Sequence, residues 1–222
     1  MTSYSLAFKS LSLAAMLLAA QAAHATITVY TNEAEYMAAV GATGIDNFDD
    51  FTTADGPAQR MAGDYSYSAA TASGALSPRL YAVGEPNDGW LSVENARDKA
   101  VFSNFADHVR GVGGLFFNTD DKGGVASGRS ITLTATEAEG DTRTYTVAVP
   151  QRDSFVGFVS TGTLSNITMA ARGQTDFPFY YPTVNNLHIS VAAVPEADSY
   201  AMLLAGLGLV GWTVRRRKRA AR

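Results

Sequence analysis

Apolar and hydroxyl side chains alternate along much of the chain, and the clearest run lies between residues 131 and 149. Ile131 to Thr136 and Thr144 to Val149 both alternate in this way, and a turn at residues 139–141 separates them. A period of two places apolar side chains on one face of a strand and polar ones on the other. The pattern therefore predicts a β-hairpin with one buried face.

Similar short apolar runs recur between turn-rich segments. They are residues 27–30, 65–67, 80–83, 90–93, 101–105, 115–117, 155–159, 167–171 and 187–191. One short helix is expected near Asn32 to Val40, because Asn32 offers an N-cap, Glu35 follows it and Gly41 stops the pattern. About ten short strands with Gly and Asn/Asp turns favour a sandwich. The predicted fold is mainly β: a single antiparallel β-sandwich or jelly roll with one short N-terminal helix.

The first 25 residues have a different pattern. Lys9 precedes an apolar run from Leu11 to Ala20, and Ala23-His24-Ala25 follows it. A basic start, a short apolar core and a small-x-small site are typical of a secretory signal peptide. The apolar run would span about 15 Å as a helix, half of a bilayer core. We expect cleavage after Ala25, which leaves residues 26–193 as an extracellular body.

Residues 194–222 form a third segment. An uncharged stretch at about 199–214 predicts a membrane helix of about 24 Å, and the basic residues after it can reach the bilayer surface. The tail at 215–222 supplies a stop-transfer signal that keeps this end inside the cell. Its basic cluster consists of Arg215, Arg216, Arg217, Lys218 and Arg219.

The residues around this helix carry a family resemblance. Val194, Pro195 and Glu196, followed by a Gly- and Leu-rich stretch and an Arg cluster, resemble the PEP-CTERM sorting signal, although Ala197 stands where the family pattern has proline. The same tail is also labelled an ice-binding-protein C-terminal domain, and that label describes the tail alone. The resemblance implies exosortase as a partner in an exopolysaccharide-producing Gram-negative bacterium. It also implies transient anchoring in the inner membrane, followed by the cell surface or the extracellular matrix.

The charge of the body narrows its partners. Residues 26–193 contain 10 Lys and Arg and 19 Asp and Glu, a formal balance of −9, whereas the whole chain has −4. An acidic body repels phosphate backbones, so no nucleic-acid partner is expected. Cysteine is absent, which excludes thiolate chemistry and a disulfide framework.

The body shows no catalytic motif. Its two histidines, His108 and His188, lack the spacing of a zinc site, and His188 is expected to face solvent from an alternating strand. Ser127 lacks the spacing of a nucleophile elbow. The prediction is a protein that is not an enzyme. An exported hydrolase stays an alternative, because two carboxylates suffice for glycoside hydrolysis.

Two acidic clusters suggest a calcium site: Asp46, Asp49 and Asp50 form the first, and Asp120 and Asp121 belong to the second. Oxygen ligands on Gly-flanked loops suit Ca²⁺, while solvated turn residues are the alternative interpretation. Segments 48–51, 113–120, 155–160 and 182–187 also resemble the β-sandwich bodies of other PEP-CTERM proteins, which are similar to carbohydrate-binding jelly rolls. That resemblance implies a structural calcium held by acids of the first strand and by Asn185 or Asn186 of the last. The predicted calcium ligands are Asp46, Asp49, Asp50, Asp120, Asp121 and Asn186.

Glycan binding needs aromatic rings that are presented to solvent. Trp90, Tyr180 and Tyr181 are the predicted glycan contacts, and a core position is the alternative for Trp90. The predicted function is an exported, exosortase-sorted envelope or exopolysaccharide-matrix protein that binds glycans without catalysis. A structural surface protein without a small ligand is the main alternative. Ice binding would need a flat array of threonines, and residues 132–136 supply one strand of it.

Overall fold

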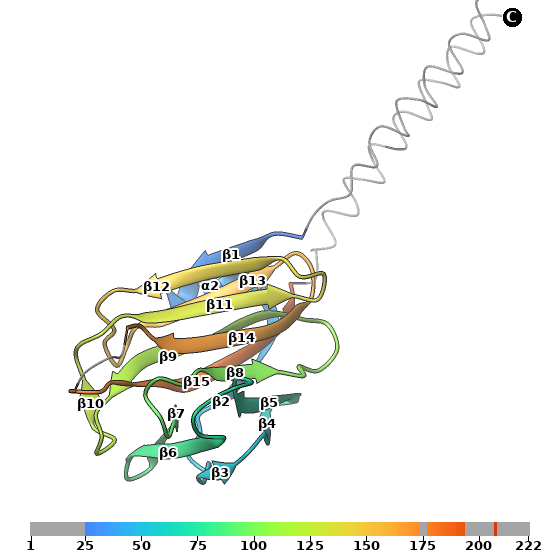
Figure 1. Ribbon diagram of the computed structural model, residues 1–222. Coiled ribbons are helices and arrows are strands. Elements are labelled where there is room, and N and C mark those ends of the chain that lie inside the picture. Colours follow the sequence, from blue (N-terminus) through green and yellow to red (C-terminus); the bar gives the residue numbers. More distant parts are fainter. Residues whose placement is uncertain (1–24, 174–176, 194–206, 208–222) are drawn as a thin grey trace, which may run out of the picture.

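The computed structural model describes residues 25–173, 177–193 and 207. These residues form two antiparallel sheets that stack face to face, with one short helix (Figure 1). The predicted mainly β sandwich with a single N-terminal helix is therefore confirmed. The predicted signal peptide and membrane helix fall almost wholly outside the described residues. Among the residues that are described, no helix is long and apolar enough to cross a membrane.

One sheet has nine strands and the other has six. The nine-stranded sheet consists, in spatial order, of β1 (Ile27–Tyr30), β13 (Phe155–Ser160), β9 (Val109–Thr119), β15 (Tyr181–Ala192), β7 (Asp88–Val93), β6 (Arg79–Glu85) and β3 (Ala54–Asp55), with β10 (Val125–Ala126) beside β9 and β2 (Val40–Asp46) beside β15. The six-stranded sheet consists of β12 (Thr142–Val147), β11 (Ile131–Glu137), β14 (Leu164–Ala171), β8 (Ala100–Ser103), β5 (Tyr65–Thr71) and β4 (Ala58–Ala62).

The described residues hold fifteen strands, more than the sequence pattern predicts. The additional strands lie mostly at sheet edges. For example, β4 and β2 contain no continuous apolar run, yet they pair with β5 and β15 through their backbones. Backbone pairing does not depend on side-chain alternation, so such edge strands leave a weak sequence signal.

The long β9–β15 pair runs through the middle of the nine-stranded sheet. On its other side β15 pairs first with β7, at Thr183 and Val184, and then with β2, from Leu187 to Ala192. A register shift between Asn185 and His188 marks this change of partner. Asn186 there has a φ of 48°, a left-handed conformation that asparagine tolerates better than most residues.

The main core fills the space between the two sheets. Side chains from both inner faces meet there, and they are almost fully buried. Its largest members include Phe48, Tyr67, Phe102, Phe116, Phe158, Leu80, Leu91 and Leu133. The predicted hairpin contributes as expected, because the apolar residues of β11 are buried and its threonines are only partly so.

The outer face of the nine-stranded sheet is covered at one end by helix α2 (Glu33–Ala39). Asn32 caps it as predicted, since its Oδ1 accepts the backbone N–H of Glu35 at 3.1 Å. Tyr36 is fully buried on the sheet, and its Oη lies 2.8 Å from the Oγ of Ser190. Gly157 makes room for this ring, because a Cβ there would lie 2.3 Å from a ring carbon of Tyr36. No helix of the described residues covers the other end of the same face, which we call the open end.

Candidate functional site

The open end of the outer face contains a groove built from β6, β7, β9 and β15. It consists of two adjoining hollows of about 180 and 210 Å³, which share Glu94 and Tyr181. The first hollow also includes Tyr81 and Asp121, and the second also includes Phe179. We call this feature the outer groove. It lies at the opposite end of β9 and β15 from Tyr36, because Tyr181 pairs with Thr119, the last residue of β9.

The floor of the outer groove is a chain of buried hydroxyl groups. The Thr119 and Thr183 oxygens are 2.9 Å apart, and the Thr183 hydroxyl lies 3.1 Å from the Oγ of Ser92. Ser92 in turn donates to the backbone carbonyl of Pro182 at 3.1 Å. These hydroxyls satisfy one another, so the floor is polar without a buried unpaired group.

Aromatic rings stand along the groove. Tyr81 is 45% exposed, and Tyr181 and Phe179 are half-buried. The guanidinium of Arg97 lies 5.5 Å from the centre of the Phe179 ring. Burial raises the pKa of Tyr181, and the nearby Asp121 carboxylate raises it further, so the Tyr181 hydroxyl keeps its proton and can donate. The groove therefore combines apolar ring faces with hydrogen-bonding groups.

Carboxylates edge the first hollow, and two of them already have partners. Glu94 pairs with Arg79 at 3.1 Å. Asp120 Oδ1 accepts the backbone N–H groups of Lys122 and Gly124, both at 2.9 Å, and so shapes the loop after β9. Asp121 is exposed. The structure thus brings two predicted ligand sets together, since Asp120 and Asp121 of the calcium set lie in the same hollow as Tyr181 of the glycan set.

The predicted glycan contact at Trp90 is wrong. Its side chain is only 1% exposed and packs edge to face on Phe117, with ring centres 5.0 Å apart. Arg152 covers the indole at 5.1 Å, and the indole Nε1 donates to Asp88. Trp90 therefore belongs to the packing beneath the surface, which is the core position expected as the alternative. Tyr180 is half-buried, and its ring lies where a Cβ on Gly128 would be.

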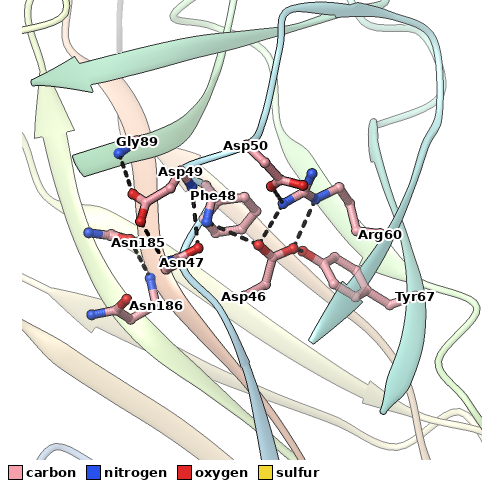
Figure 2. A network of polar contacts seen from close by, with 10 residues as sticks. All are labelled: Asp46, Asn47, Phe48, Asp49, Asp50, Arg60, Tyr67, Gly89, Asn185 and Asn186. Carbon is pink, nitrogen blue, oxygen red and sulfur yellow. Dashed lines mark hydrogen bonds and ion pairs between the residues drawn. The ribbon is translucent and has the colours of Figure 1, made fainter. Parts of the chain in front are cut away.

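In the first acidic cluster, Arg60 bridges the carboxylates of Asp46 and Asp50 (Figure 2). Arg60 Nη2 lies 2.6 Å from Asp46 Oδ1 and 2.7 Å from Asp50 Oδ1, and Arg60 Nε lies 2.9 Å from Asp46 Oδ2. The hydroxyl of Tyr67 and the backbone N–H of Phe48 also donate to Asp46. Asp46 is 4% exposed, so this is a buried, fully bonded ion pair that ties β2 to β4 and β5.

The charges of this cluster reinforce one another. Burial and the Asp46 carboxylate raise the pKa of Tyr67, so its hydroxyl remains a donor. The hydrogen bond and charge of Arg60 lower the pKa of the exposed Asp50 carboxyl. For Arg60, burial opposes the charged form, but the two carboxylates outweigh it and raise the pKa. A guanidinium thus supplies the positive charge that calcium would supply in the predicted metal site.

The remaining calcium residues do not form a metal cage around Asp46. Asp49 accepts the backbone N–H of Gly89 at 2.9 Å and the side-chain amide of Asn47 at 2.6 Å. Figure 2 shows Asn186 on the Asp49 side of the network, where its backbone N–H bonds the side chain of Asn185. No group of three or more His, Cys, Asp or Glu residues in the described ranges could hold a metal. Asp46, Asp49 and Asp50 bond to protein groups in this structure, as the alternative of turn acids expects.

His188 is buried, contrary to the expectation that it faces solvent. It is 2% exposed, and its ring packs edge to face on Tyr36 and Phe155. Its Nδ1 lies 2.7 Å from the carbonyl of Asn186, and its Nε2 lies 3.1 Å from Glu33 Oε1. His188 does lie in an alternating strand, as predicted. Helix α2, however, covers the face of the sheet on which the sequence pattern placed a solvent-exposed His188.

The outer face of the six-stranded sheet carries an array of threonines. Thr134 of β11 faces Thr144 of β12 on one side and Thr168 of β14 on the other. Thr132 pairs with Thr146 of β12 and Thr136 with Thr142, whereas on the β14 side they pair with Ala170 and Asn166. The array is wider than the single strand expected from the sequence. These pairs include no aromatic ring, so this face does not match the outer groove as a glycan surface.

Replacing Arg60 tests the role of the buried ion pair. Arg60→Met should lower the free energy of unfolding by about 3–5 kcal/mol, because it leaves Asp46 buried without a counter-ion. Asp50→Asn is the matched control. It removes an exposed partner of the same guanidinium and should cost at most about 1 kcal/mol. Urea unfolding measures both, and equal losses would contradict the central role of Asp46.

Comparison with known proteins adds one finding about the tail. A family model of the PEP-CTERM protein-sorting motif matches residues 193–218. None of the curated proteins matches the chain. One similar solved structure is the CBM22-1 xylan-binding domain from Paenibacillus barcinonensis Xyn10C, at 13% identity over 70% of this chain and 98% of that chain. Its TM-score of 0.30 is too low to carry an argument about this chain. The chain therefore carries a PEP-CTERM sorting motif, which implies export and membrane-anchored sorting by an exosortase.

Proposed function

We propose that this exported protein binds a glycan in its outer groove, without catalysis, at the cell surface or in the extracellular matrix. The observation that supports the proposal is the combination of Tyr81, Phe179 and Tyr181 beside hydroxyl and carboxylate groups in one open groove. A sugar ring has an apolar face of C–H bonds and a rim of hydroxyls. Aromatic side chains with polar neighbours complement both parts.

The charge of the groove favours neutral or amino-bearing sugars. Glu94, Asp120 and Asp121 line the first hollow, and the body as a whole is acidic. Like charges at a contact lower affinity, so a polyuronate would bind less well than a neutral chain. Glu94 and Asp120 already serve structural partners, which supports a role in binding and not in proton transfer.

A glycan array with point variants tests this proposal. The array should include neutral β-linked oligosaccharides, amino-sugar oligomers and polyuronates. Tyr81→Ala and Tyr181→Ala should each weaken the strongest binding about tenfold, which corresponds to about 1.4 kcal/mol. Thr134→Ala, on the other sheet, is the control and should leave the affinity unchanged. Signals no higher than background for every glycan would favour the structural surface protein instead.

Sorting by the tail is tested separately. In a strain with an intact exosortase, the mature protein should lack residues 215–219, and in a strain without it those residues should remain. Replacing the five basic residues with Gln should disturb retention or orientation, because they provide the cytoplasmic charge. Mass spectrometry of the C-terminal peptide reads the outcome. A mature protein that keeps the basic cluster in both strains would contradict exosortase processing.

A further inference from the structure

A carboxyl group lies at the end of the main core. In β11 the inward-facing residues are Ile131, Leu133, Ala135 and then Glu137, because the alternation continues to the end of the strand. Glu137 is only 2% exposed. An ionisable side chain at such a position is costly unless it is paired. The carboxyl of Glu137 therefore needs a partner at this end of the core.

The hydrogen bonds of Glu137 are incomplete. Its Oε1 accepts from the hydroxyl of Ser160, whereas its Oε2 is buried and has no partner. No Lys or Arg among the described residues forms an ion pair with it. The guanidinium of Arg110 donates to the carbonyl of Thr161 at 2.8 Å instead. A buried polar group without a partner destabilises the fold, and a charged one does so more strongly.

The first described residue of the chain lies beside this carboxyl. A Cβ on Gly162 would be 2.8 Å from the Cβ of Ala25 and 3.7 Å from the Cδ of Glu137. Ala25 and Glu137 therefore approach the same point next to Gly162. The next residue, Thr26, is held in place, because its backbone N–H donates to Thr161 Oγ1 at 2.9 Å and its carbonyl accepts from Thr161 N–H.

We propose that the α-ammonium group of Thr26, created by signal-peptide cleavage after Ala25, is the counter-ion of Glu137. Cleavage removes the Ala25 methyl group from the space beside Gly162 and leaves a cation with three N–H donors next to it. One N–H keeps the bond to Thr161, and another reaches the free Oε2, directly or through one water. The mature end thereby completes a hydrogen-bond set that the precursor leaves open.

This proposal is independent of glycan binding. The tight contact at position 162 is with the Cβ of Ala25, and cleavage after Ala25 removes that contact. The proposal also predicts the cleavage site. A chain that starts one residue earlier has its ammonium group one residue away from the Thr26 nitrogen, and a chain that starts later lacks the hydrogen bond from that nitrogen to Thr161. The mature protein should therefore start at Thr26.

A double-mutant cycle tests the ion pair. Residues 26–222 are purified in detergent with Thr26 as a free N terminus, and compared with the same protein extended by Ser-Ala. Each form is made with Glu137 and with Glu137→Gln, which keeps the size of the side chain. The extension should lower the melting temperature by about 3 °C or more with Glu137 and by less than about 1 °C with Gln. Equal shifts in both backgrounds overturn the proposal.

Two further measurements distinguish this ion pair from a pair with Arg110 and from a steric effect of the added residues. Arg110→Met should leave the effect of the extension unchanged, and loss of that effect would make Arg110 the true partner and overturn the proposal. Labelling of the α-amine by an acylating reagent should be several-fold slower with Glu137 than with Glu137→Gln, because a paired ammonium is a poor nucleophile. Equal labelling rates, or an exported protein whose first residue is not Thr26, would also overturn it.

Discussion

The central β9–β15 pair constrains the rest of the structure. β15 extends from Tyr181 to Ala192, and it keeps β9 on one side while its partner on the other side changes from β7 to β2. That change divides the outer face of the sheet into two ends. At one end Tyr36 and α2 pack over glycines. At the other end β7 and β6 broaden the sheet without a covering helix, and the outer groove forms there.

The polar network of Figure 2 lies where this change of partner occurs. Asp46 is the last residue of β2, and Asp49 bonds the backbone of Gly89 near the start of β7. Asn185 bonds Asp88 at 3.0 Å, which ties β15 to the same region. Arg60 joins this junction to the six-stranded sheet. These contacts hold β2, β7, β15 and β4 together at this point.

Local patterns in the sequence were enough to predict the architecture. The alternation from residue 131 to 149 indicated the hairpin, and the Asn32 cap indicated the helix, because both signals depend on neighbours along the chain. The partner of Asp46 could not be predicted in this way, because Arg60 belongs to the other sheet and reaches Asp46 only when the two sheets stack. Likewise, Tyr181 and Asp121 meet through the β9–β15 register. Trp90 was ambiguous because an aromatic ring suits a core as well as a ligand site.

The position of Glu137 in the sequence indicates an interaction with a residue outside its own hairpin. The alternation that predicts the hairpin also places Glu137 on the apolar face, one step beyond Ala135. A charged residue at a position where the alternation predicts a buried side chain indicates that a partner is present. The alternation does not show which residue that partner is. The partner that we propose, the amino group of Thr26, is more than a hundred residues away in the sequence, and the chain next to it approaches Glu137 only in the folded sandwich.

The central claim is that the open end of the outer face binds a glycan, and amide chemical shifts test it most directly. The isotope-labelled protein would be titrated with the oligosaccharide that gives the strongest signal on a glycan array. We predict shifts concentrated at Tyr81, Asp121 and Tyr181, with the Thr134 face unchanged. Shifts that centre on the threonine array, or no shifts at saturating sugar, would contradict it.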